Sequence, residues 1–254
     1  MFQYEKNMFY DCHLHFPMRL SEPVSHLLKV IDSSINLKGF ILILNSSMEE
    51  ELYLRNMELF KQRNHVPAFL LNMDSEICIK KFEKLEDMGI KYVVKIHPRI
   101  SRITRDDFIY LKDCLKQLSF QTVIVDNWVF GSQIENHVGT ELAIYIAESF
   151  PNKTIVSAHA GGCRIVESML LTRPVKNIFH DLSLTQMYFK GSSLEMDIDY
   201  FIRWSCERIL FGSDYPTFGI SESWDSFKKH YDNAGKIDKL NRSFELAKEI
   251  YGLK

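Results

Sequence analysis

Eight short apolar runs recur along the chain, and a segment with the periodicity of an amphipathic helix follows each of them. The runs are rich in Val, Ile and Phe and continuously apolar, as parallel strands are when both of their faces are buried. Eight strands alternating with helices over about 250 residues have the size and rhythm of a closed (β/α)8 TIM barrel, and an open doubly wound sheet is the structural alternative. We therefore expect an α/β fold in which residues 1–254 form one barrel domain. The expected strands are Met8–Phe16, Gly39–Leu44, Pro67–Leu71, Tyr92–His97, Thr122–Asp126, Thr154–His159, Asn177–Ser183 and Arg208–Asp214.

Local signals place the ends of several expected helices. Ser21 is expected to cap the first helix, and the segment Ser47–Glu50 fits a capping box. Gly89 is placed to end a helix, and Thr104 is placed to begin another. The last expected helix carries on one face Leu240, Phe244, Ala247 and Tyr251.

Composition narrows the class of protein. The 31 basic and 33 acidic residues leave a net charge of −2 without a basic stripe, which argues against a nucleic-acid partner. The densest apolar run, Phe40–Leu44, is far too short to span a membrane, and the N-terminal MFQYEKNMFYDCH lacks the apolar core of a signal peptide. Five scattered cysteines without a CxxC pair are typical of reduced thiols. We expect a cytoplasmic protein with a small-molecule substrate, and homo-oligomer formation stays open.

Titratable side chains stand where the first and last expected strands end. His13 and His15 are two residues apart, so on a strand both side chains point to the same face, where two imidazoles can bind a divalent transition metal. Asp214 ends the eighth strand, and it could ligate that metal, accept a proton from metal-bound water, or do both. The alternatives are two unrelated polar residues near a loop and an aspartate that caps the following turn.

Two further strand ends carry candidates for catalysis and substrate binding. His159 ends the sixth strand in SAHAGG, where it could serve as an acid–base group or polarise a carbonyl, or be a packed histidine. Lys95 and His97 share a face of the fourth strand, and a lysine inside a barrel needs an anionic partner, either the substrate or a structural carboxylate. Arg99, past this strand, is a candidate for holding a substrate carboxylate, or a solvated surface arginine.

The motifs DCHLHFP, GIKYVVKIHPR, TIVSAHAGG and RILFGSDYP, with the terminal NRSFELAKEIYGLK, together resemble the amidohydrolase-related family of metal-dependent hydrolases. This branch includes aminocarboxymuconate semialdehyde decarboxylase and pyrone dicarboxylate lactonase. The resemblance spans nearly the whole chain. It implies a barrel with a divalent metal, most often zinc, held by His13, His15 and Asp214, and a catalytic histidine at His159.

One position departs from the family pattern. The family places a further histidine ligand at the end of strand five, where this chain has Asp126. A metal set of His13, His15, Asp126 and Asp214 is chemically reasonable, and its oxygen donors make manganese or iron more competitive with zinc. If Asp126 is not a ligand, His137 or His180 are possible substitutes, although His180 fits a barrel-wall histidine better.

The leading functional hypothesis is hydrolysis of a small polar ester, lactone or amide. A bound metal lowers the pKa of water from about 15.7 toward about 7. Asp214 would accept the proton of this water, and the metal or His159 would polarise the carbonyl that is attacked. Non-oxidative decarboxylation on the same scaffold is the first alternative. A non-catalytic binding protein that has lost part of the metal site is the second.

Overall fold

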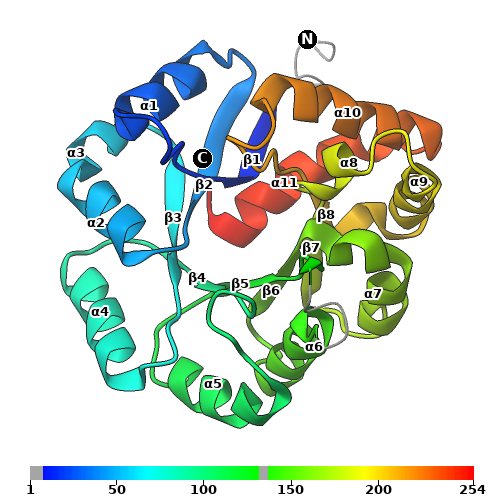
Figure 1. The fold of residues 1–254 in the computed structure, drawn as a ribbon. Helices are drawn as coiled ribbons and strands as arrows, with labels where there is room; N and C mark the ends of the chain where they lie inside the picture. The colour runs from blue at the N-terminus through cyan, green and yellow to red at the C-terminus, as the bar shows by residue number, and fades with distance from the viewer. Residues whose placement is uncertain (1–7, 132–136) are drawn as a thin grey trace.

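The computed structural model describes residues 8–131 and 137–254. Residues 1–7 lie outside this range. They begin the N-terminal segment from which we expect no signal peptide. Figure 1 shows a barrel of strands surrounded by helices. Among the described residues, no helix combines the length and the apolar character needed to cross a bilayer.

Eight parallel strands follow one another in chain order, and each pairs with the next. The strands are β1 (Phe9–Leu14), β2 (Leu37–Leu44), β3 (His65–Leu70), β4 (Val93–Ile96), β5 (Thr122–Asp126), β6 (Thr154–Ala158), β7 (Ile178–Asp181) and β8 (Ile209–Leu210). All eight expected strands are therefore present. The eighth is regular over only two residues, so Asp214 lies beyond it rather than within it.

Backbone hydrogen bonds between the segment after β8 and strand β1 close the barrel. The Cys12 amide donates to the Phe211 carbonyl at 2.9 Å, and the Asp214 amide donates to the His13 carbonyl at 2.8 Å. The His15 amide donates to the Tyr215 carbonyl at 2.7 Å, beside a parallel bridge between Leu14 and Tyr215. This closure confirms the barrel over the open sheet, and we refer to it below as the closing seam.

Helices cover the outside of the barrel, and one closes its end. The helices are α1 (Pro23–Ser33), α2 (Ser47–Arg55), α3 (Met57–Phe60), α4 (Ser75–Asp87), α5 (Phe108–Leu115), α6 (Gly139–Ser149), α7 (Ile165–Thr172), α8 (Thr185–Tyr188), α9 (Leu194–Ser205), α10 (Ile220–Asn233) and α11 (Leu240–Tyr251). Tyr251 of α11 belongs to the same buried cluster as Tyr10 and Val93, at the starts of β1 and β4. Helix α11 therefore covers the end of the barrel where strands begin (Figure 1).

Side-chain alternation along the strands divides the core into two parts. On β2, Ile41 and Ile43 join the cluster inside the barrel, whereas Phe40, Leu42 and Leu44 join the cluster between strands and helices. This is the period of two that a β-strand imposes, and both faces are apolar because both are buried. The continuous apolar runs of the sequence follow from this double burial.

The predicted helix ends are partly confirmed. Gly89 follows α4 with φ +65°, a left-handed conformation suited to glycine. Thr104 precedes a 3₁₀ turn that leads into α5, and its amide donates to Asp107 at 2.7 Å. The cap predicted at Ser21 is wrong, because α1 begins at Pro23, whose ring fixes φ for a first helical turn without a side-chain cap.

The capping box of α2 is displaced by one residue from the prediction at Ser47–Glu50. Ser46 is the N-cap, and its hydroxyl oxygen accepts from the Glu49 amide at 3.3 Å. The Glu49 Oε2 accepts from the Asn45 amide at 2.8 Å. Two adjacent serines, each with a glutamate three residues later, offer both registers, and the sequence alone does not separate them.

Buried His180 on β7 makes the stability of the fold sensitive to acid. Its Nε2 lies 3.1 Å from the Thr172 hydroxyl, and its ring meets Phe201 edge-on, so it faces the helices. Burial, together with Arg208, lowers its pKa from 6.5 to about 4. Between pH 6.5 and about pH 4, His180 therefore takes up a proton in the unfolded chain but not in the folded one. The free energy of unfolding consequently decreases as the pH falls through this range.

We expect His180→Gln to lose less stability than the wild type between pH 7 and pH 5. The difference should be on the order of 1–2 kcal/mol, because a buried group with a lowered pKa resists the proton that the unfolded state accepts. Urea unfolding at the two pH values measures it. Equal losses in both proteins would show that His180 is not held neutral.

Candidate metal centre

His13 presents one buried ring nitrogen without a partner. Its Nδ1 lies 3.1 Å from Asp181 Oδ2, and its Nε2 has no hydrogen-bond partner among the described residues. Burial lowers the pKa of His13 to about 4, so the ring is neutral at pH 7, although Asp181 opposes this shift. A neutral ring that donates from Nδ1 to a carboxylate leaves a lone pair on Nε2, which is the arrangement of a metal-ligating histidine.

Gly212 leaves room for this ring. A Cβ atom at position 212 would lie 2.8 Å from the Cβ atoms of both His13 and Ser183. Real Cβ atoms do not approach so closely, so the packing of the first strand against the eighth requires glycine here. The sequence motif LFGSDYP thus carries a steric requirement beside its titratable residue.

Asp214 lies against both histidines of the first strand. Its Oδ1 is 3.8 Å from His13 Nε2 and 3.5 Å from His15 Nε2. Its φ of +59° is left-handed, a conformation that aspartate tolerates better than most residues. Burial disfavours its charge, but His15, His159 and His13 outweigh burial and hold the pKa of Asp214 below its usual value. The carboxylate is therefore ionised at neutral pH.

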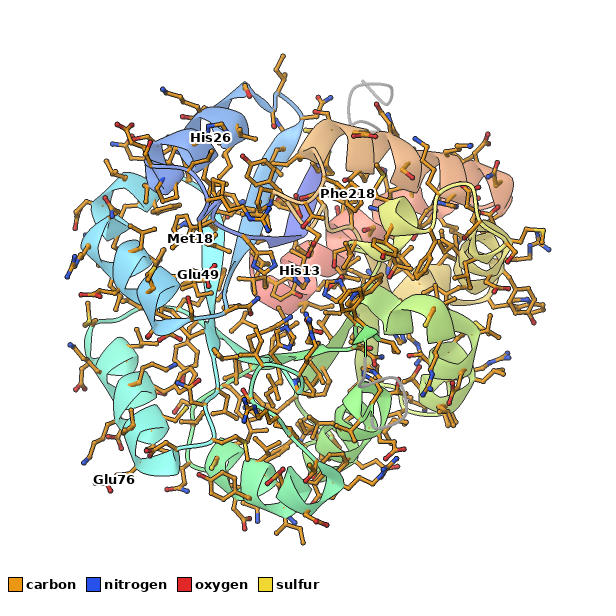
Figure 2. All side chains as sticks on the ribbon, viewed as in Figure 1. His13, Met18, His26, Glu49, Glu76 and Phe218 are labelled. Atoms are coloured by element: carbon orange, nitrogen blue, oxygen red, sulfur yellow. The ribbon has the colours of Figure 1, made fainter. Side chains whose placement is uncertain are left out.

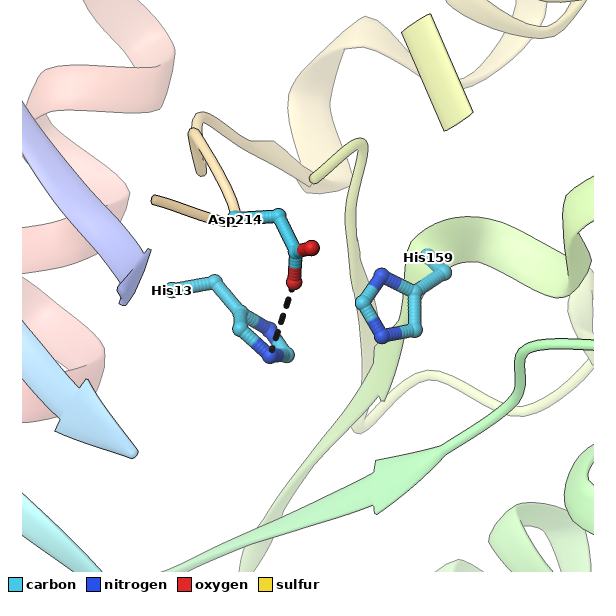
Figure 3. Close-up of side chains that lie close together, drawn as sticks. All are labelled: His13, His159 and Asp214. Carbon is cyan, nitrogen blue, oxygen red and sulfur yellow. Dashed lines mark ion pairs between the residues drawn. The ribbon is translucent and has the colours of Figure 1, made fainter. Parts of the chain in front are cut away.

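His159 completes a group of three buried donors. Donor atoms of His13, His159 and Asp214 all lie within 4.8 Å of one another (Figure 3). A divalent transition metal commonly takes three such nitrogen and oxygen ligands and keeps an open position. Of these three, His13 and Asp214 also lie beside His15, so these side chains fit a metal ion.

A strained turn positions His159 directly after β6. Residues His159 and Ala160 have left-handed φ values of 60° and 49°, and Gly161 and Gly162 continue the series. A Cβ at Gly161 would meet Ser168 at 2.7 Å, and one at Gly162 would meet Trp128 at 3.0 Å. The close approach that the glycines allow is to protein.

Acceptors surround the imidazole of His159. Its Nδ1 lies 2.9 Å from the Ser183 carbonyl, and its Nε2 lies 3.2 Å from Asp126 Oδ2. Both nitrogens face acceptors, so both can carry protons. Burial lowers the pKa of His159, but Asp126, Asp214 and Asp181 outweigh it and raise the pKa to about 9. His159 is therefore a proton donor inside the cavity.

Asp126 contacts His159 and two basic residues of the fourth strand and its end. Its Oδ2 is 3.2 Å from Lys95 Nζ and 3.6 Å from His97 Nε2, and its Oδ1 accepts from the Trp128 amide at 3.2 Å. Burial raises its pKa, yet His97, Lys95 and His159 more than offset this and hold the pKa well below the usual value. The acid is thus an ionised partner of several cationic or donating groups.

The structure brings together most, but not all, of the predicted site residues. Apart from His13 and Lys95, they line a cavity of 260 Å³ at the ends of the strands. The lining includes His15, His97, Arg99, Asp126, His159 and Asp214. Lys95 is completely buried beneath this cavity and does not line it. His137 contacts Asn127 Oδ1 at 2.6 Å and His180 faces the helices, so neither joins the cluster of donors.

Asp181 is the residue that sequence reasoning missed. Its Oδ2 faces His13 Nδ1, and its Oδ1 accepts from the His159 amide at 3.1 Å and from Ser183. One carboxylate therefore fixes both histidines. Its position at the end of the seventh strand, in NIFHDLS, was the available signal, because acids at strand ends of a barrel face the functional mouth.

Comparisons with known proteins identify the fold. No family model and no curated protein matches the sequence. Among solved structures, the TatD homologue YjjV of Escherichia coli K12 superposes with a TM-score of 0.63 at 13% identity, over 98% of this chain and 100% of that chain. The uncharacterized TIM-barrel protein Bb4693 of Bordetella bronchiseptica gives 0.62 at 15% identity, over 87% and 83%. The 5-carboxyvanillate decarboxylase LigW of Sphingomonas paucimobilis gives 0.58 at 12% identity, over 90% and 86%. This likeness shows the barrel fold.

The role of Asp126 can be tested by Asp126→Asn. If Asp126 serves Lys95 and His159, the variant should keep its metal affinity but lose stability by about 3 kcal/mol or more, because Lys95 then keeps a buried charge without a partner. Calorimetric zinc titration and urea unfolding measure the two effects. Asp199→Asn, which removes a carboxylate 2.6 Å from His230 outside the cavity, is the matched control.

A fall in metal affinity of well over tenfold in Asp126→Asn, with an unchanged affinity in Asp199→Asn, would contradict this expectation. It would instead make Asp126 a ligand.

Proposed function

We propose that this protein is a metal-dependent hydrolase of the amidohydrolase type, acting on a small polar ester, lactone or amide. The observation that carries the proposal is the buried Nε2 of His13, which makes no hydrogen bond within the described parts of the chain and lies 3.8 Å from the Asp214 carboxylate. A buried polar atom without a partner is costly, and a metal ion would satisfy it. The fold likeness to enzymes such as LigW supports the proposal.

We assign the metal to His13, His15 and Asp214. His15 is the most exposed of the three, with 17% of its side chain accessible, so it faces the cavity from which a metal would enter. Two nitrogens and one oxygen suit zinc, and manganese or iron compete when oxygen donors increase. The contacts of Asp126 favour a role as partner of Lys95, His97 and His159 over a role as fourth ligand.

The reaction needs an activated water and a polarised carbonyl. A divalent metal bound at this site would supply both, by lowering the pKa of water and by drawing electron density from a carbonyl oxygen. Asp214 is ionised and lies at the cavity wall, so its free lone pairs can accept the proton of the attacking water. Neighbouring carboxylates raise the pKa of His159, so it can donate to the carbonyl oxygen or to the leaving group.

Asp126 and Asp181 would maintain these roles. Asp126 keeps His159 protonated, and Asp181 keeps the His13 proton on Nδ1, away from the cavity. Trp128 meets the His159 ring edge-on at 5.8 Å between centroids and limits its movement. The cavity of 260 Å³ suits a small substrate.

The position of Arg99 favours a substrate with an anionic group at one end. It lines both this cavity and a neighbouring one of 610 Å³, which Arg102 also lines. Neither arginine has a carboxylate partner within residues 8–131 and 137–254. A carboxylate on the substrate can therefore bind here through the planar guanidinium groups.

Decarboxylation is the second candidate. The protonated His159 could deliver its proton to a carbon atom, replacing a carboxylate that leaves as CO₂. The comparison with a 5-carboxyvanillate decarboxylase favours keeping this candidate. Acid release with water uptake would identify the hydrolase, whereas CO₂ release without water uptake would identify the decarboxylase.

The first test is metal content. Protein purified without chelator should carry about one divalent transition metal per chain, because a mononuclear site needs only the ligands assigned here. The double variant His13→Ala/His15→Ala should carry none. His26→Ala, which removes an exposed histidine on α1, should keep the full content in elemental analysis. Unchanged stoichiometry in the double variant would place the metal elsewhere and defeat the proposal.

The second test concerns His159. We expect His159→Asn to keep the metal and lose a factor of about 10² to 10⁴ in kcat, which is the usual contribution of a positioned proton donor. Initial rates on small ester and lactone substrates at pH 7 measure this loss. Full activity in His159→Asn would remove it from the mechanism. Bound metal without turnover in the wild type would favour the binding-protein alternative.

A further inference from the structure

A second cavity adjoins the proposed metal centre on the side of the first strand. Its volume is 750 Å³, and Pro216 and Thr217 line both it and the metal cavity. Most of its wall is apolar and comes from the segment after β1 and from the turn after Asp214. The apolar lining residues are Phe16, Pro17, Met18, Leu20, Tyr215 and Pro216. An apolar cavity of this size, next to a polar centre, has the character of a small-molecule subsite.

Glu49 is the buried charge in the wall of this cavity. It is only 8% exposed and belongs to the capping box of α2. In Figure 2, Glu49 of α2 and Met18 lie on the side of His13 where helices α1 and α2 stand. The capping box uses a single carboxylate oxygen, Oε2, which accepts from the Asn45 amide at 2.8 Å and from the Ser46 hydroxyl at 3.0 Å.

The other carboxylate oxygen of Glu49 is available to a ligand. Within the described parts of the chain, Oε1 accepts no hydrogen bond and no basic side chain pairs with Glu49. The cations on the same cavity, Arg19 and His26, are exposed and belong to its rim. A buried acid gains most from a donor that reaches it through an apolar channel, because water competes least there.

We infer that this cavity binds an apolar arm of the substrate that ends in an N–H or O–H donor, and that Glu49 accepts the hydrogen bond of that donor. The inference rests on the proposed function. It describes the end of the substrate opposite to the anionic end that Arg99 would bind. The substrate class is then a molecule whose reacting bond lies between a carboxylate and an alkyl or aryl arm bearing an amine or a hydroxyl.

Binding of simple probes tests this inference without catalysis. The probes are hexylamine, hexan-1-ol and hexanoate, titrated calorimetrically into protein dialysed free of metal, so that no probe can coordinate an ion. We expect hexylamine to bind more tightly than hexan-1-ol, and hexanoate to bind weakest because its charge repels Glu49. Butylamine should bind about 15-fold more weakly than hexylamine, since each buried methylene contributes about fourfold in affinity.

Two variants separate the two parts of the subsite. Glu49→Gln keeps the capping box, because glutamine serves as well as glutamate at this position, and it should remove the preference for amine over alcohol. Leu20→Asn changes a residue that is 43% exposed, so folding is preserved, and it should weaken the alkyl probes together. Arg102→Gln, in the opposite cavity, is the control and should change no amine affinity.

The inference and the proposed function fail separately. Hexanoate binding as tightly as hexylamine, or an unchanged amine preference in Glu49→Gln, would overturn the inference even if the protein binds zinc and hydrolyses esters. Affinity independent of chain length would do the same. Chain-length-dependent amine binding that Glu49→Gln abolishes would support the inference, even in a protein that proves to lack metal.

Discussion

The closing seam between β1 and the segment after β8 is the interaction on which the rest of the structure depends. It joins residues about two hundred positions apart through the amides of Cys12, His15 and Asp214. Without this pairing, the His13 and Asp214 side chains would have no reason to meet, because they belong to opposite ends of the sheet. Closure pairs backbone amides at the two edges of the sheet, and it also brings the His13 and Asp214 side chains together.

Three acids set the charge balance in the buried layer beneath the cavity. Asp181 accepts from His13, Asp126 accepts from Lys95 and His159, and each acid stabilises a defined protonation state. Asp11 is the exception, because its Oδ1 accepts from the His13 and Ser213 amides while its Oδ2 accepts no hydrogen bond from residues 8–131 or 137–254. Burial accordingly raises the pKa of Asp11 to about 7. The layer therefore holds two ionised carboxylates, Asp126 and Asp181, and a third acid, Asp11, whose pKa lies near pH 7.

The sequence predicts the scaffold better than it predicts the contacts. Double burial makes each strand an apolar run, so all eight strands and the strand-end position of His159 could be found from residue patterns. Patterns do not say which neighbour a side chain reaches. Asp126 was placed at the correct strand end, but its pairing with Lys95 and His97 depends on side-chain reach across adjacent strands. Asp181 was overlooked beside His180 because a sequence does not show which of two adjacent titratable residues faces inward.

Gly212 has a consequence for the evolution of this surface. Since a Cβ at this position would lie 2.8 Å from those of His13 and Ser183, no other amino acid fits without moving the first strand. The loops after each strand can diversify in sequence and length, whereas this point in the floor of the mouth cannot. Mutational libraries aimed at new substrates should therefore vary the rim and leave position 212 fixed. A single methyl group at this position would displace the side chain of His13.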